Sequence, residues 1–135
     1  MTVYFCLDER NGLSFNKRRQ SRDAAVLGDI SSRLSGELLI DPMSVSMVQE
    51  AEIPYCIALP ELTEKMPDVH YFVESRQPGD WVSLADQVVL YRWNRHYPAD
   101  RRFTLNLASM GFALQQTMEF PGTSHEIITR EVYTK

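Results

Sequence analysis

Residues 2–8, with the sequence TVYFCLD, form an almost uninterrupted run of apolar, β-branched and aromatic side chains. A run without polar alternation is typical of a strand that is buried on both faces, as in the centre of a parallel or mixed sheet. Other elements must then cover both faces of that sheet, because neither face can be left to water. This first strand therefore favours an α/β architecture.

A helix is expected soon after the first strand. Asn11-Gly12 indicates a turn, and Ser21 is a suitable N-cap for a helix over residues 22–34. Four apolar residues of this segment recur at helical spacing: Val26, Leu27, Ile30 and Leu34. Gly36 then favours the end of the helix.

A second strand and a second helix follow. The segment 37–41 is short and mostly apolar, which predicts a buried strand. Pro42 predicts a helix over 42–51, because proline favours the first helical position. Residues 55–59 fit either a strand or an apolar loop. The order β-α-β-α implies parallel neighbours joined by helical crossovers.

The second half of the chain is mostly strands. Aromatic and β-branched residues predict strands over 69–74 and 87–93, with a turn over 75–80 between them. Pro98 places the residues that follow the second of these strands in a loop.

An antiparallel hairpin is expected at the C-terminus. Two segments with alternating apolar residues, 111–120 and 125–135, flank the Pro-Gly loop 121–124. The expected fold is therefore a single α/β domain over residues 1–135. It has a mixed sheet, helical crossovers in the N-terminal half and an antiparallel C-terminal hairpin.

Composition is consistent with one globular domain, since the 135 residues are 44% hydrophobic and 24% charged. No apolar run is long enough to cross a bilayer, and the N-terminus lacks the basic region of a secretory signal. A cytoplasmic protein without membrane association is expected. Cys6 and Cys56 lie in apolar runs and are expected to be buried free thiols. Homo-oligomerisation stays open.

Positive charge is concentrated in two places. The net charge of −4 and the pI near 5.3 argue against a generic nucleic-acid binder, although nucleic acid stays open as a partner. More than half of the 14 Lys and Arg residues lie in the segments 17–22 and 92–102. Brought together, these segments would form a local anion-binding face; kept apart, they would be two solvated basic surfaces.

The order of the expected elements resembles the dihydrofolate reductase fold. The segments that carry the resemblance are, in chain order, 3–30, 38–48, 71–78, 88–103 and 124–133. They are similar to that family's first strand, loop and helix, its second strand and helix, its third strand and turn, and its closing strands. The resemblance places Asp23 at the position of the family's substrate-binding acid, and it implies a nicotinamide-dependent reductase.

The cofactor of that family is held through its pyrophosphate at a Gly-Gly strand-to-helix turn. This sequence contains no Gly-Gly pair. The chain is also shorter, as if the adenosine-binding part were missing. No cofactor is therefore predicted, and reductase activity is the disfavoured alternative.

Three other segments, 15–23, 91–100 and 122–133, are similar to small bacterial proteins that often carry the label ribonuclease Z. Ribonuclease Z enzymes use a two-metal site with a clustered His-x-His-x-Asp-His run. The three histidines of this chain are isolated from one another: His70, His96 and His125. No metal site is predicted.

Asp23 and His125 are the candidate catalytic residues. An acid near a helix start is stabilised by the helix dipole, but Asp23 could also anchor a ligand. His125 is a candidate general acid–base that would need a carboxylate partner, because the adjacent Glu126 points to the opposite face of a strand. The chain has no Gly-x-Ser-x-Gly elbow, so the sequence does not indicate a serine nucleophile.

The candidate ligand-binding residues are mostly cations of the two basic segments: Lys17, Arg18, Arg19, Arg22, Arg92, Arg95 and His96. Guanidinium groups near a helix start suit phosphate, and aromatic side chains beside arginines suit a base. In the second segment a structural cluster is the alternative, with arginine stems packed on Trp93 and Asp100 paired with Arg101 or Arg102.

These features lead to four possible functions. The first is binding of a small anionic ligand that is phosphorylated or nucleotide-like. The second is a hydrolase or nuclease that uses His125 and Asp23. The other two are a nicotinamide-dependent reductase and a structural or partner-binding protein.

Overall fold

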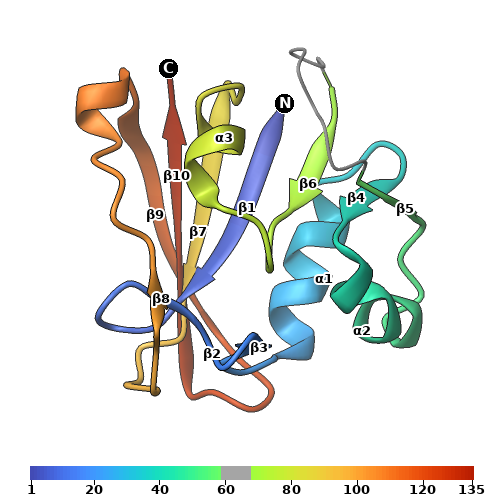
Figure 1. Ribbon diagram of the computed structural model, residues 1–135. Helices are drawn as coiled ribbons and strands as arrows, with labels where there is room; N and C mark the ends of the chain where they lie inside the picture. The colour runs from blue at the N-terminus through green and yellow to red at the C-terminus, as the bar shows by residue number, and fades with distance from the viewer. Residues whose placement is uncertain (59–67) are drawn as a thin grey trace.

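The computed structural model describes residues 1–58 and 68–135. Its main sheet has seven strands in the order β5-β4-β6-β1-β7-β10-β9 (Figure 1). In that order the strands are Tyr55–Ile57, Leu38–Ile40, His70–Phe72, Thr2–Leu7, Gln87–Arg92, Ile127–Thr134 and Ala113–Pro121. The first five run parallel, whereas β10 is antiparallel to both of its neighbours. The mixed sheet and the C-terminal hairpin are confirmed.

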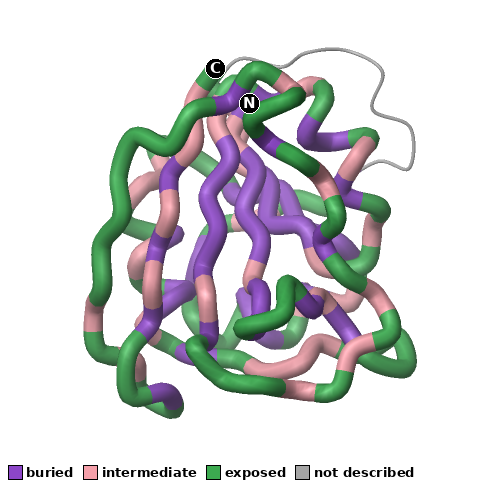
Figure 2. Tube along the Cα trace, turned by 90° about the vertical axis from the view of Figure 1, so that its left-hand side faces the viewer, coloured by how far each residue is buried: buried purple, intermediate pink, exposed green. Residues whose placement is uncertain are grey.

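Two layers cover the sheet. Helices α1 (Ala24–Ser32) and α2 (Val45–Glu50) pack with Tyr4 on one face. Helix α3 (Pro78–Val82) packs with Phe5 on the other face, and the segment that follows β8 completes that layer. Successive side chains of β1 therefore enter opposite cores, as the unbroken apolar run requires, and the central strands are buried along their length (Figure 2). Within the described residues, no helix has the length and apolar character needed to span a membrane.

The helix starts differ from the sequence prediction. Asp23, and not Ser21, is the N-cap of α1, because its backbone is extended and its carboxylate accepts a hydrogen bond from the Ala25 N–H. The second helix begins with a 3-10 turn, Pro42–Ser44, before α2. The predicted turn over 75–80 contains the start of α3, which Pro78 begins at the first helical position. A second 3-10 turn lies at Ala108–Met110.

A second, three-stranded sheet lies where the sequence predicted loops. It is formed by β2 (Gly12–Phe15), β3 (Arg18–Arg19) and β8 (Arg101–Arg102), in the order β3-β2-β8. This small sheet lies beyond the carboxyl ends of β1 and β6, at the bottom of Figure 1. Ser14 of β2 pairs with Arg19 on one side and Arg101 on the other, so the two basic segments meet.

Burial of the cysteines differs from the expectation. Both thiols are free, but Cys6 is only half-buried and Cys56 is exposed. Cys56 lies on β5, the edge strand of the main sheet, where an apolar sequence does not guarantee burial. The predicted segment 55–59 forms a strand as far as Ile57, and its last residue lies outside the described residues.

Gly28 offers a test of how α1 is stabilised. It lies in the middle of the helix, is exposed, and has no atom within 4 Å of the position that a Cβ would take. Gly28→Ala should therefore raise the free energy of unfolding by about 0.5–1 kcal/mol, because alanine loses less backbone entropy. Urea denaturation would measure the change, and a loss of stability would show that α1 is not a regular helix at this position.

Candidate functional site

The candidate site lies at the carboxyl ends of β1 and β6. The chain leaves β1 through α1 toward β4, and it leaves β6 through α3 toward β7 on the opposite side. Adjacent parallel strands whose connections diverge in this way leave a crevice where ligands bind in open α/β sheets. Two clefts are found here, and both are partly lined by Glu74.

The first, called the narrow cleft, lies between α1, α2 and the segment that precedes α1. Its walls are mostly apolar: Cys6, Val26, Leu27, Met47, Phe72 and Trp93. Its rim is polar and includes Arg19, Gln20, Ser21 and Arg22. About 20 Å³ is open to the centre of a water molecule, which is room for one or two waters.

The second, called the open cleft, has a volume of about 560 Å³. It is lined by Ser14, Lys17, Met43, Glu74, Ser75, Asp100 and Arg101. Ser14 is 3% exposed, and its hydroxyl has no hydrogen-bond partner. A buried hydroxyl without a partner is costly, so this atom marks a place where a polar group would be stabilised.

Glu74 separates the two clefts. Its carboxylate accepts two hydrogen bonds of 2.9 Å from the Arg19 guanidinium and one of 2.7 Å from the Ser44 hydroxyl. A bidentate pair between a guanidinium and a carboxylate is among the stronger ion pairs in proteins. Here it holds β3 against the end of β6. Glu74 was not predicted as a site residue, and no feature of its own sequence segment indicates this contact.

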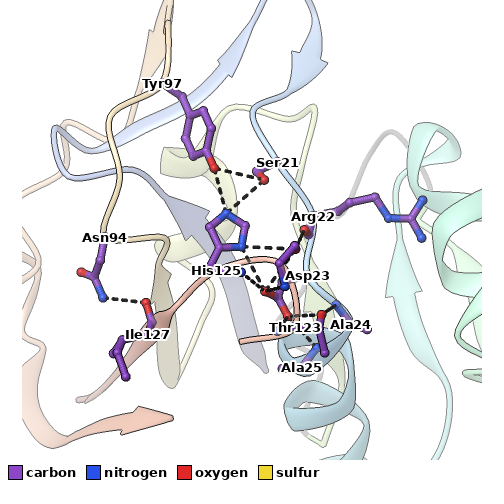
Figure 3. Close-up of polar contacts among 11 residues, drawn as sticks. Ser21, Arg22, Asp23, Ala24, Ala25, Asn94, Tyr97, Thr123, His125 and Ile127 are labelled. Atoms are coloured by element: carbon purple, nitrogen blue, oxygen red, sulfur yellow. Dashed lines mark hydrogen bonds and ion pairs between the residues drawn. The ribbon is translucent and has the colours of Figure 1, made fainter. Parts of the chain in front are cut away.

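Asp23 is the most densely bonded group of the site (Figure 3). Its carboxylate accepts hydrogen bonds from the N–H groups of Ala25, Thr123, Ser124 and His125, at 2.8–3.0 Å. Burial alone would raise the pKa of Asp23, but these bonds and the His125 side chain hold it well below the ordinary value. Both oxygens are occupied, so the contacts favour a structural or orienting carboxylate over a ligand anchor.

His125 contacts Asp23 directly, so the two predicted catalytic residues do meet. Its Nδ1 lies 3.0 Å from Asp23 Oδ2, and its Nε2 lies 3.1 Å from Ser21 Oγ and 2.9 Å from the Tyr97 hydroxyl. The ring stacks on Trp93 with centroids 4.6 Å apart. Ser21 and Tyr97 were not predicted as site residues, because only the closure of two loops brings them to the imidazole.

Asp8 and Asp41 are further buried carboxylates at the crevice. Asp8 follows β1 and accepts hydrogen bonds from the N–H groups of Arg10, Gly12 and Tyr97. Burial would raise its pKa, but these bonds lower it below the ordinary value. Asp41 follows β4 and accepts hydrogen bonds from the turn after β6 and from the Tyr71 hydroxyl.

The cations of the first basic segment are divided between the two clefts. Lys17 lines the open cleft, Arg18 is exposed, and Arg19 and Arg22 line the narrow cleft. Arg19 is paired with Glu74, as described above, and Arg22 with Glu50 at 2.6 Å. The helix start itself is closed to anions, because the Ala24 N–H donates to the Thr123 hydroxyl and the Ala25 N–H to Asp23.

The cations of the second segment lie mostly elsewhere. Arg92 pairs with Glu131 at 3.0 Å, outside both clefts, and Arg95 and His96 are exposed. The predicted pairing of Asp100 with its neighbouring arginines is wrong. Asp100 instead accepts a hydrogen bond from the Asn16 N–H, and Arg101 and Arg102 donate to backbone carbonyls. The ring of His125 packs on Trp93.

Metal ligation finds no support among the residues that the structure describes. No three of their His, Cys, Asp and Glu side chains are grouped so that they could hold an ion.

Comparison with known proteins identifies the fold. No family model and no curated protein sequence matches the chain. A solved dihydrofolate reductase from Enterococcus faecalis, in complex with NADP(H) and RAB-propyl, matches with a TM-score of 0.66 and 9% sequence identity. The match covers 98% of this chain and 94% of that one. The chain has a dihydrofolate reductase-like fold. At this identity the likeness shows the architecture alone, and function must come from the site.

Gly122 tests the packing around Asp23. A Cβ at this position would lie 2.5 Å from Asp23 Oδ2 and 2.5 Å from the His125 carbonyl oxygen. Gly122→Ala should therefore lower the free energy of unfolding by about 1–3 kcal/mol, since the hairpin turn must move away from the carboxylate. Chemical denaturation would measure the loss. Gly36→Ala, which meets no atom within 4 Å, is the matched control, and equal effects of the two variants would contradict the contact.

Asp23 also predicts a dependence of stability on pH. Because its pKa is lower in the folded protein than the unfolded value of about 3.9, its stabilisation is full above about pH 5 and is lost as the pH falls toward the lowered pKa. Asp23→Asn should cost about 2–3 kcal/mol at neutral pH and flatten the acid limb of the stability curve. Denaturation between pH 7 and pH 2 would show this, with the exposed Asp80→Asn as the control. An unchanged acid limb in Asp23→Asn would show that another group causes the acid sensitivity.

Proposed function

We propose that this protein binds a small anionic ligand, phosphorylated or nucleotide-like, in the open cleft. The observation that carries the proposal is the buried, unpartnered hydroxyl of Ser14, which lines that cleft together with Lys17 and Arg101. A hydroxyl donor and two cations that line one cleft suit a phosphate or carboxylate group. The volume of about 560 Å³ is within the range of small-molecule sites.

The charge balance of the open cleft supports an anion. Arg101 donates its guanidinium hydrogen bonds to the carbonyls of Glu74 and Arg76, and among the described residues no carboxylate pairs with it. Glu74 is neutralised by Arg19, which leaves Asp100 as the acid that opposes Lys17 and Arg101. The four charged residues of the lining sum to zero, and the local balance becomes positive once Arg19, which lies outside this cleft, is counted against Glu74.

Lys17 is held at the cleft by a strained backbone. Asn16 and Lys17 form the two-residue turn between β2 and β3, with φ values of 51° and 60°. A left-handed conformation costs a lysine about 1–2 kcal/mol relative to the ordinary helical one. Asparagine or glycine would fit this position better, so the presence of lysine supports a role for its charge.

The cofactor of the structural neighbour does not fit this chain. That protein was solved with NADP(H). The resemblance to that family implies a Gly-Gly turn that holds the pyrophosphate, and this sequence contains no Gly-Gly pair. After β6, the next turn of this chain carries Glu74 and Ser75. The N–H groups of both residues donate to Asp41 Oδ2 at 2.9 Å, so they are directed at a side chain of the protein itself. Reductase activity is not part of the proposal.

A hydrolase or nuclease that uses His125 and Asp23 is the second candidate function. The observation that favours it is the 3.0 Å contact between the imidazole and the carboxylate. If no anion stabilises the protein in the experiment below and no hydrolysis is detected, a structural or partner-binding role is the remaining candidate.

Thermal denaturation with added anions tests the ligand proposal. Inorganic phosphate, pyrophosphate and the common nucleoside phosphates are the compounds to use. A ligand at about 100 times its Kd should stabilise the protein by about 2.7 kcal/mol. Lys17→Asn removes the charge while keeping a residue that accepts the left-handed turn, and it should weaken binding about tenfold. Arg10→Ala, which removes an exposed positive charge, is the control. If none of these anions stabilises the protein, the ligand proposal is wrong.

A further inference from the structure

Three side chains at the narrow cleft form a chain of hydrogen bonds that resembles a nucleophile with its base. Ser21 Oγ lies 3.1 Å from His125 Nε2, and His125 Nδ1 lies 3.0 Å from Asp23 Oδ2 (Figure 3). Ser21 lines the narrow cleft and is half-buried, whereas His125 and Asp23 are each 3% exposed. Asp23 also lines this cleft, but Ser21 is the most exposed of the three residues and lies at the polar rim.

The hydrogen bonds determine which nitrogen of His125 carries its proton. An ionised carboxylate only accepts hydrogen bonds, and the pKa of Asp23 is held low, so Nδ1 is assigned as the protonated nitrogen. Nε2 of the neutral ring is then an acceptor, and it faces the hydroxyl groups of Ser21 and Tyr97. This tautomer is the one that accepts a proton from a serine during attack.

The base is held in place from several sides. Four backbone N–H groups orient the Asp23 carboxylate, so it cannot turn away from the imidazole. The indole of Trp93 stacks on the ring at an interplanar angle of 21°. Such rigid support of the orienting carboxylate and of the base is what nucleophilic catalysis needs beyond the distances themselves.

We infer that Ser21 is the nucleophile of an acyl-transfer reaction in which His125 is the general base and Asp23 its positioning residue. The substrate class is an ester with a short acyl group, because the apolar narrow cleft beside Ser21 leaves room for only a few atoms. The inference rests on the second candidate function, which it deepens by naming a nucleophile. It is independent of the anion site in the open cleft.

The reaction needs no co-reactant other than water. Ser21 Oγ bonds to the ester carbonyl carbon as its proton moves to His125 Nε2. The bond from that carbon to the alcohol oxygen then breaks, and the leaving alcohol takes the proton from Nε2. Water next attacks the acyl-serine, gives a proton to Nε2 and releases the carboxylic acid, while Ser21 Oγ regains a proton from Nε2.

The Tyr97 hydroxyl has two possible partners in this scheme. In the free protein it lies 2.9 Å from His125 Nε2 and 3.4 Å from Ser21 Oγ. It is therefore close enough to the nucleophile to donate a hydrogen bond to the oxyanion that forms at the attacked carbon.

Covalent labelling and ester hydrolysis test the inference on the full chain. A fluorophosphonate should label Ser21, as located by mass spectrometry of the peptides. Hydrolysis of p-nitrophenyl acetate should fall at least about 100-fold in Ser21→Ala. Ser35→Ala, which alters an exposed serine, should change neither result.

Each outcome decides for or against Ser21. Absence of label on wild-type Ser21, or hydrolysis that persists in Ser21→Ala, would overturn the inference. The labelling result holds even if Ser21→Ala does not fold, because it is obtained on the wild type. Labelled RNA provides a separate arm: cleavage that is lost in His125→Ala but kept in Ser21→Ala would retain the hydrolase and remove Ser21 as its nucleophile.

Discussion

The ionised carboxylate of Asp23 joins parts of the chain that are far apart in the sequence. It caps α1 by accepting a hydrogen bond from the Ala25 N–H, and it accepts another from the Thr123 N–H in the turn between β9 and β10. It also orients the imidazole of His125. Through that ring it also contacts the loop that carries Tyr97. Burying a charge is costly unless it is fully hydrogen-bonded, so the helix start, the hairpin turn and the two loops must come together as one unit.

The same arrangement recurs at the ends of two parallel strands. Asp8 follows β1 and Asp41 follows β4, and each accepts hydrogen bonds from backbone N–H groups of a neighbouring turn. Unpaired N–H groups at such strand ends and helix starts are what commonly bind phosphate in α/β folds. Because this chain uses its own carboxylates as the anions at these positions, the proposed binding of an external anion relies on side chains, namely Ser14, Lys17 and Arg101.

The ion pair between Arg19 and Glu74 lies between two clefts whose linings differ in polarity and in volume. On one side, apolar walls and little free volume surround the hydroxyl of Ser21 and restrict what can approach it. On the other side, a larger cleft is lined by two cations, two acids and a buried hydroxyl without a partner. This dihydrofolate reductase-like architecture therefore contains two neighbouring clefts of different chemical character.

The class of fold was predictable from the sequence, because the apolar run 2–8 and the alternation in the last two segments are local patterns that reflect burial. It also singled out Asp23 and His125 as the candidate catalytic residues of one hydrolase or nuclease hypothesis. Two-residue strands such as Arg18–Arg19 are too short to show an alternation of apolar and polar residues, so the small sheet was not predictable from the sequence. Only the tertiary structure decided that Ser21 and Tyr97 meet the imidazole. Those contacts span 104 and 28 residues of sequence, and they exist because the loops close on one buried charge.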